Sequence, residues 1–167
     1  MLMSDYIWPI PDFLKERLQI SFVHLDKCEL KLRTNELLKF LFLCSKYSGG
    51  FAPIKKEVDE VWHESILQTV EYAELCNSLP GRRFIHHRSG NLAAYMEKID
   101  AKNVITRLMQ WIPMYYKHFG PMNNEEAKSW TIPSYLIKEL GMTLQNIEHM
   151  AKRFLEAQEH NEKASLL

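Results

Sequence analysis

Apolar residues three or four positions apart run through most of the chain, and this period is that of an amphipathic helix. The period predicts a first helix after Pro9 and Pro11. Its single apolar stripe consists of Phe13, Leu14, Leu18, Phe22 and Leu25. A second helix is predicted from Thr34, a residue type that often caps helix starts, to Gly49. The second helix is apolar on almost every side, so we expect it at the centre of the fold.

The longest helix is predicted from about residue 54 to residue 78, between Pro53 and Pro80. Each residue advances a helix by about 100°, which gathers the apolar positions on one side. That side holds Val58, Trp62, Ile66, Thr69, Val70, Ala73 and Cys76. Asp59 and His63 are four residues apart at the edge of this stripe. We therefore expect a carboxylate and an imidazole to point inward together.

Glycine and proline mark most of the remaining boundaries. Residues 82–90 lack a helical period and predict an extended connector. A fourth helical region is predicted from about Asn91, with its best part over 104–119 and a kink or break at Pro113. Further helices are predicted over 124–130, 133–141 and 143–162. The sequence thus predicts an all-α fold, a single compact helical bundle of about five to six helices over residues 1–167. Residues 1–10 and 160–167 are expected to fray.

Composition narrows the classes of function. The 167 residues carry 21 Lys and Arg against 21 Asp and Glu, so a nucleic-acid partner is not expected. The longest apolar stretches fall short of the roughly 20 residues that a membrane span needs, so no membrane association is expected. The first residues lack a secretion signal, and Cys28, Cys44 and Cys76 form no close pair. We expect a cytoplasmic protein with reduced thiols and no nucleotide cofactor.

Two histidines in the predicted connector change the interpretation of Asp59 and His63. An extended segment sends neighbouring side chains to opposite sides, so either His86 or His87 can face the long helix. Two imidazoles and one carboxylate are ligands that divalent Fe, Mn or Zn accept, with open positions left for water or a substrate. Mononuclear non-haem iron sites use such a set. The candidate metal ligands are therefore Asp59, His63, His86 and His87.

Other side chains of the same helix are placed to support these ligands by packing or hydrogen bonds. They are Trp62, Thr69, Tyr72 and Cys76. Simple packing accounts for each of them equally well, and Cys76 is either a soft ligand, a reactive thiol or a buried inert one. No residue is assigned as catalytic.

Two alternatives remain for Asp59, His63 and their neighbours. The first is a structural pair in which Asp59 accepts a hydrogen bond from His63 and no metal binds. The second is a di-iron bundle, because Glu60 and His63 form a Glu-x-x-His motif, although no second copy is present. A zinc-protease helix is excluded, since Leu67 occupies the place of the second histidine. No comparable motif elsewhere in the sequence predicts a catalytic or binding site.

The motifs together resemble a known family. Val58-Asp59-Glu60-Val61-Trp62-His63, then Phe84-Ile85-His86-His87, and later Tyr116 with Phe119-Gly120-Pro121 and Trp130 are similar to those of the glycine-rich domain-containing protein-like family. The chain resembles a short stand-alone version of the helical part, without a glycine-rich tail. The resemblance implies that Asp59, His63, His86 and His87 group together, and it names no reaction.

We therefore predict a cytoplasmic metal-binding helical protein that holds a divalent Fe, Mn or Zn ion. The more specific hypothesis is that the protein is a small non-haem metal-dependent enzyme that oxidises or hydrolyses a small-molecule substrate. The alternative is a metal-free helical module that binds a protein partner, in which the polar groups only fix the packing of the helices.

Overall fold

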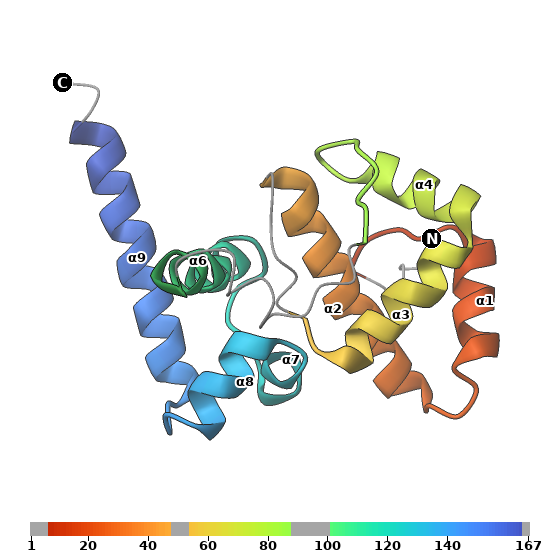
Figure 1. Ribbon diagram of the computed structural model, residues 1–167, viewed down its shortest axis with the longest axis horizontal. Coiled ribbons are helices and arrows are strands. Elements are labelled where there is room, and N and C mark those ends of the chain that lie inside the picture. Colours follow the sequence, from red (N-terminus) through yellow and green to blue (C-terminus); the bar gives the residue numbers. More distant parts are fainter. Residues whose placement is uncertain (1–6, 48–53, 88–100, 165–167) are drawn as a thin grey trace. The chain divides into compact units, whose positions relative to one another are not determined.

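The computed structural model describes residues 7–47, 54–87 and 101–164, and the regular structure in these ranges is helical (Figure 1). The all-α prediction is confirmed. The predicted count of five to six helices is wrong, because eight form in the described ranges. The chain divides into two compact units, residues 1–87 and 88–167. A single domain over 1–167 stays a prediction, and residues 1–6 and 165–167 lie outside the described ranges.

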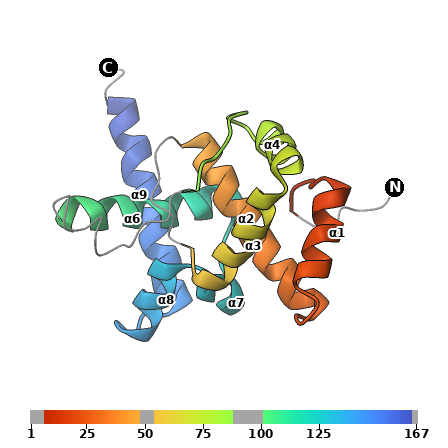
Figure 2. The same cartoon turned by 45° about the vertical axis from the view of Figure 1, so that its right-hand side comes forward.

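The first unit contains α1 (Asp12–Ser21), α2 (Lys27–Lys46), α3 (Lys56–Leu67) and α4 (Thr69–Ser78). The helices α2 and α3 pack against each other, and α1 lies beside α3 and α4 (Figure 2). An extended connector, residues 79–87, follows α4. The connector returns to α3 and therefore brings the end of this unit to the helix that carries Asp59.

The second helix is largely buried, as its apolar sequence predicts, whereas α3 is the helix that packs against α1, α2 and α4. The buried apolar side chains of α2 are Leu30, Leu37, Leu38, Phe40, Leu41, Leu43 and Cys44. The predicted start at Thr34 is wrong, because the helix begins at Lys27 and Thr34 is a buried interior residue. Asp26 caps the start instead, since its carboxylate accepts a hydrogen bond of 2.8 Å from the Glu29 backbone N–H.

The first helix buries part of its predicted stripe. Leu14, Leu18 and Phe22 are buried, whereas Phe13 is exposed. Since Phe13 and Leu14 are adjacent and about 100° apart on the helix, a stripe centred on Leu14 and Leu18 leaves Phe13 on its rim.

The predicted helix over 54–78 is interrupted, which accounts for part of the error in the helix count. It breaks at Gln68, whose ψ of 70° lies outside the helical range, and α4 begins one residue later. The break turns the second half about its axis, so Thr69 and Val70 are exposed while Tyr72, Leu75 and Cys76 are buried. Of the predicted stripe, Val58 and Trp62 before the break and Cys76 after it are buried, whereas Thr69 and Val70 are not.

The second unit contains α6 (Ala101–Phe119), α7 (Asn124–Lys128), α8 (Thr131–Lys138) and α9 (Leu144–Ala164). The helix α6 runs through Pro113 and packs on α9, while α8 contacts both and α7 packs on α8. Thr143 caps the last helix as predicted, because its hydroxyl accepts from the Asn146 backbone N–H at 3.1 Å. In the part of the chain that the structure describes, no helix is long and apolar enough to cross a bilayer.

Candidate metal centre

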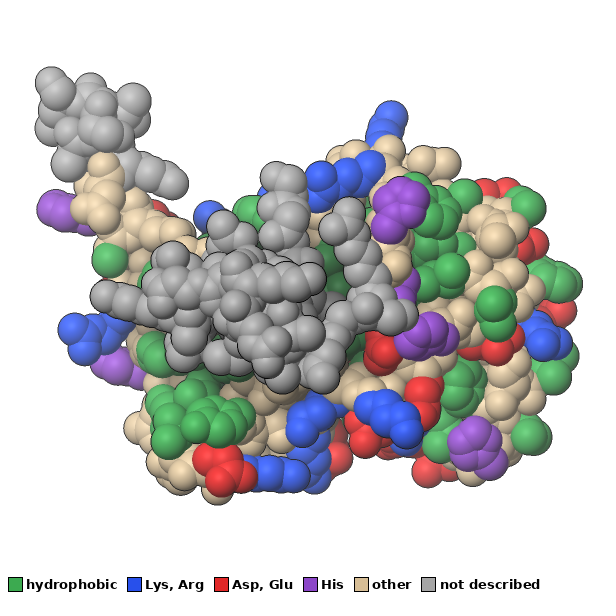
Figure 3. Space-filling model, viewed as in Figure 1, with side chains coloured by type: hydrophobic (Ala, Val, Ile, Leu, Met, Phe, Trp, Pro, Cys, Tyr) green, Lys and Arg blue, Asp and Glu red, His purple; other side chains and the backbone are tan. Residues whose placement is uncertain are grey.

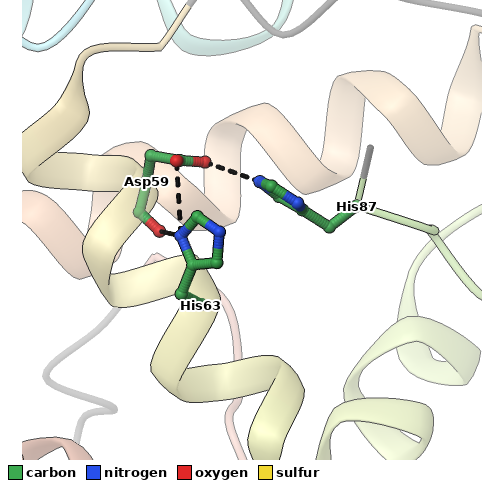
Figure 4. A group of neighbouring side chains, drawn as sticks. All are labelled: Asp59, His63 and His87. Atoms are coloured by element: carbon green, nitrogen blue, oxygen red, sulfur yellow. Dashed lines mark hydrogen bonds and ion pairs between the residues drawn. The ribbon is translucent and has the colours of Figure 1, made fainter. Parts of the chain in front are cut away.

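Three side chains from α3 and the connector meet at one place (Figure 4). One ligand atom from each of Asp59, His63 and His87 lies within 4.8 Å of the other two. The carboxylate lies between the imidazoles, with Asp59 Oδ1 3.0 Å from His87 Nε2 and Asp59 Oδ2 3.3 Å from His63 Nδ1. The two imidazole rings are 4.2 Å apart between centroids. This group, Asp59, His63 and His87, is called the triad below.

These spacings are compatible with a shared metal ion. Two ligands that bind one ion at about 2.1 Å, with an angle of about 90–110° between them, lie roughly 3.0–3.4 Å apart. Both carboxylate–imidazole distances fall in that range. The 3.0 Å contact is also an ordinary hydrogen bond, and His63 Nδ1 has an acceptor in the Asp59 backbone carbonyl oxygen at 2.9 Å, so the same arrangement satisfies these polar atoms without an ion.

The triad lies at the surface of its unit and not in the core. The exposed fractions of the side chains are 15% for His87, 31% for Asp59 and 53% for His63. The expectation that His63 points inward is therefore wrong, because its helix position lies on the rim of the buried face. An ion from solution can reach the three ligands from the His63 side.

The connector that carries His87 is held against α2 by two contacts. The Gly81 backbone N–H donates to Ser45 Oγ at 2.7 Å, and a Cβ at Gly81 would lie 2.1 Å from the Ser45 carbonyl oxygen. Only glycine fits at that approach. The Arg83 guanidinium then donates to the Cys44 carbonyl oxygen. These contacts fix where the connector begins its path back to α3.

A buried hydrogen-bonded chain fixes where the connector ends. Trp62 Nε1 donates to Tyr72 Oη at 2.8 Å, and that hydroxyl donates to the Ile85 carbonyl oxygen at 2.7 Å. The edge of the Trp62 ring meets His87, with 4.5 Å between ring centroids. This group, Trp62, Tyr72 and the Ile85 carbonyl, is called the buried network below. Because Ile85 precedes His87 by two residues, the network sets the position of that imidazole.

Cys76 adjoins the buried network and is itself buried. Burial raises the pKa of its thiol, while hydrogen bonds with the Ile85 backbone and the Tyr72 hydroxyl act in the opposite direction. Burial also raises the pKa of Tyr72, with the nearby Cys76 as a further cause. Both groups are therefore neutral near pH 7, and Cys76 has the character of an inert buried thiol.

The remaining predicted residues lie outside the triad. The ring of His86 is exposed and lies 4.9 Å from that of Phe84 between centroids. Thr69 is exposed in the first turn of α4. Trp62, Tyr72 and Cys76 lie next to the connector that carries His87, through contacts that helix periodicity alone does not reveal. The Gly81 and Arg83 contacts were not predicted, and the only sequence signal for them is the glycine.

The acidic residues next to the triad on α3 have cationic partners. Glu64 pairs with Arg17 at 3.0 Å, and Glu60 lies 3.7 Å from Lys56. Among the described residues Glu60 is not part of the metal-compatible group, so the Glu-x-x-His motif contributes only His63. The three cysteines are free, with Cys28 exposed and the other two buried.

Comparison with known proteins tests the expected relationship. No curated protein and no solved structure matches the sequence. The predicted membership of the glycine-rich domain-containing protein-like family is wrong, because the family model that matches residues 2–124 has a different description. That match includes every residue of the triad and of the buried network. The chain belongs to the UCP032817-like family.

Proposed function

We propose that this protein binds a divalent metal ion through Asp59, His63 and His87. The observation that carries the proposal is the placing of one carboxylate between two imidazoles, all three within 4.8 Å and partly open to solvent. The most exposed member, His63, faces the solvent beside the other two.

The ligand types limit the ion. A mixed set of one oxygen and two nitrogen ligands is accepted by Fe(II), Mn(II) and Zn(II), whereas Ca(II) and Mg(II) favour oxygen ligands. Three protein ligands leave positions for water or a small substrate. A bound ion supplies Lewis acidity, and with iron also oxygen chemistry. The more specific proposal is therefore that the protein is a small metal-dependent enzyme that hydrolyses or oxidises a small molecule.

The three ligands differ in how much they must rearrange to bind an ion. His63 Nδ1 lies 2.9 Å from the backbone carbonyl oxygen of Asp59, which favours the tautomer that donates a hydrogen there. Metal binding requires an unprotonated nitrogen, so His63 has to turn its ring or change tautomer. His87 Nε2 lies 3.0 Å from the Asp59 carboxylate, which only accepts hydrogen bonds, so this nitrogen also has to release a proton, but its ring is already held in place by the buried network. We therefore expect His63 to contribute less to affinity than His87.

Calorimetric titration tests the proposal. Zn(II), Mn(II) and, without oxygen, Fe(II) are added to protein made without an affinity tag. We expect binding of one ion per chain and a loss of at least about tenfold in affinity for Asp59→Asn. Glu57→Gln is the matched control, because Glu57 is an exposed acid in the same turn of α3. Equal binding by the wild type and Asp59→Asn, or no binding by either, would contradict the proposal.

The metal-free interaction module is the second candidate, and one observation favours it. Phe13 and Ile20 are exposed, and their separation of seven residues places them on one face of α1. A surface of this kind binds an apolar partner, here most simply a second copy of the chain. Sedimentation equilibrium should then show self-association that EDTA leaves unchanged and that Phe13→Ser with Ile20→Ser removes. A monomer at all concentrations counts against this candidate.

A further inference from the structure

We infer that the metal-loaded triad takes a small ligand with an anionic oxygen head group on the ion and an apolar chain over Leu67. This inference rests on the proposed metal site and names the class of molecule that fills its open positions. Its basis is the pair formed by an exposed ligand, His63, and an exposed leucine one helical turn further along.

The helix geometry places Leu67 against His63. Residues four apart on a helix are surface neighbours, about 5–6 Å between Cβ atoms. Long helical side chains also lean toward the N-terminus, so Leu67 leans back over the turn that holds His63. The Leu67 side chain therefore lies beside His63, the most exposed ligand of the triad.

A second exposed apolar residue follows the end of α3. Leu67 is 71% exposed and Val70, in the first turn of α4, is 64% exposed. These are the two large apolar residues that α3 and α4 leave exposed. Figure 3 shows hydrophobic and histidine side chains next to one another on this face over α3 and α4. A ligand that binds the ion can cover this surface without leaving the face.

The charge of the metal centre determines which head group of the ligand is favoured. A divalent ion with one carboxylate ligand leaves the centre with one positive charge, which favours a monoanionic oxygen group such as a carboxylate or hydroxamate. The adjacent carboxylate of Glu64 is matched by Arg17 at 3.0 Å, so it adds little repulsion. The apolar neighbours then select a tail of aliphatic or aromatic carbon and disfavour a second charge.

A series of hydroxamates tests the inference on the full chain loaded with Co(II). Cobalt binding is first recorded from its visible absorption, and ligand binding from the change in that absorption. Affinity should rise from acetohydroxamate to octanohydroxamate, by up to about fourfold for each CH₂ group that is buried. Leu67→Ser should bind acetohydroxamate normally and lose most of the gain with chain length. Val23→Ser is the matched control, because Val23 is exposed and lies outside α3 and α4.

The outcomes separate the two proposals. Failure of wild-type protein to bind cobalt overturns the metal site and this inference together. Cobalt binding without any dependence on chain length overturns the inference alone. Equal binding of octanohydroxamate with and without cobalt, compared by calorimetry because the metal-free protein has no cobalt absorption, or a gain that Leu67→Ser retains, also overturns it. Circular dichroism checks that the variant is folded, and Leu67→Lys provides a second substitution at the same exposed position.

Discussion

Two polar groups, the buried network and the triad, meet at His87 and differ in how their polar atoms are satisfied. In the buried network each donor has one acceptor, from Trp62 through Tyr72 to the Ile85 carbonyl oxygen. In the triad one carboxylate serves two imidazoles at the surface, and one of them is more than half exposed. The first group has no capacity left for a ligand, whereas the second has nitrogen and oxygen atoms that an ion can bind.

This difference distinguishes polar groups that stabilise the fold from polar groups that are available to bind a ligand. A closed chain of buried hydrogen bonds fixes one arrangement, since leaving any member unpaired is costly. The partly exposed triad gains little stability from its contacts, because water competes for them. We therefore expect variants of the buried network to change stability first, and variants of the triad to change metal binding first.

The largest effect is expected for Trp62→Ala. This change removes a buried ring that contacts Phe40 and His87, together with the donor to Tyr72. Truncation of a buried aromatic side chain costs about 3–5 kcal/mol of unfolding free energy. Urea denaturation followed by circular dichroism measures the loss. A cost below about 1 kcal/mol would show that the network does not hold this unit together.

Tyr72→Phe should cost less, about 1–3 kcal/mol, because the ring stays and only the hydroxyl is lost. The Trp62 N–H and the Ile85 carbonyl oxygen then lose their partner. Metal affinity should fall as well, since His87 is no longer fixed two residues after Ile85. Denaturation and metal titration on the same variant check both effects. Unchanged metal affinity would show that His87 is positioned by other contacts.

We also expect alkaline pH to lower the stability of the first unit, through the buried thiol of Cys44. Burial raises the pKa of this thiol from 9.0 to about 12, and the nearby Arg83 acts in the opposite direction. Between pH 9 and 12 the folded state therefore keeps the thiol proton while the unfolded state loses it. The stability that this group contributes is fully present below pH 9 and is lost as the pH rises to 12. At pH 10 the loss from this group is about 1 kcal/mol. Denaturation at pH 8 and 10 should give a smaller difference for Cys44→Ala than for wild type.

The smallest effect is expected for Thr69→Ala. Thr69 is exposed on α4, outside both the buried network and the triad. Its replacement should change the free energy of unfolding by less than about 0.5 kcal/mol and leave metal affinity unchanged. Denaturation and calorimetry check this expectation. A clear loss of metal affinity would restore Thr69 as a supporting residue and extend the site to α4.

Much of the local structure follows from sequence periodicity. The burial of α2 and the one-turn spacing of Asp59 and His63 depend only on residues close in the chain. The break at Gln68 could not be predicted, because neither glycine nor proline is present there and the burial of Tyr72 and Cys76 decides it. The early start of α2 depends on Asp26, a capping signal that competes with Thr34.

The choice between the two adjacent histidines shows the same limit within the site. Alternation along an extended segment predicts that one of them faces α3, but not which one. The register is set by Tyr72, which holds the Ile85 carbonyl oxygen, and by Gly81 against Ser45. These contacts join residues that are distant in the sequence, so a single sequence cannot reveal them.

The two histidines also provide the most direct test of the central claim. Zn(II) is titrated into wild type, His87→Ala and His86→Ala, each shown by circular dichroism to be folded. His86 is the matched control, because it is exposed and lies outside the triad. The account predicts that His87→Ala weakens zinc binding by at least about tenfold and that His86→Ala leaves it unchanged. Equal binding by all three proteins, or a loss confined to His86→Ala, would contradict a metal site built from Asp59, His63 and His87.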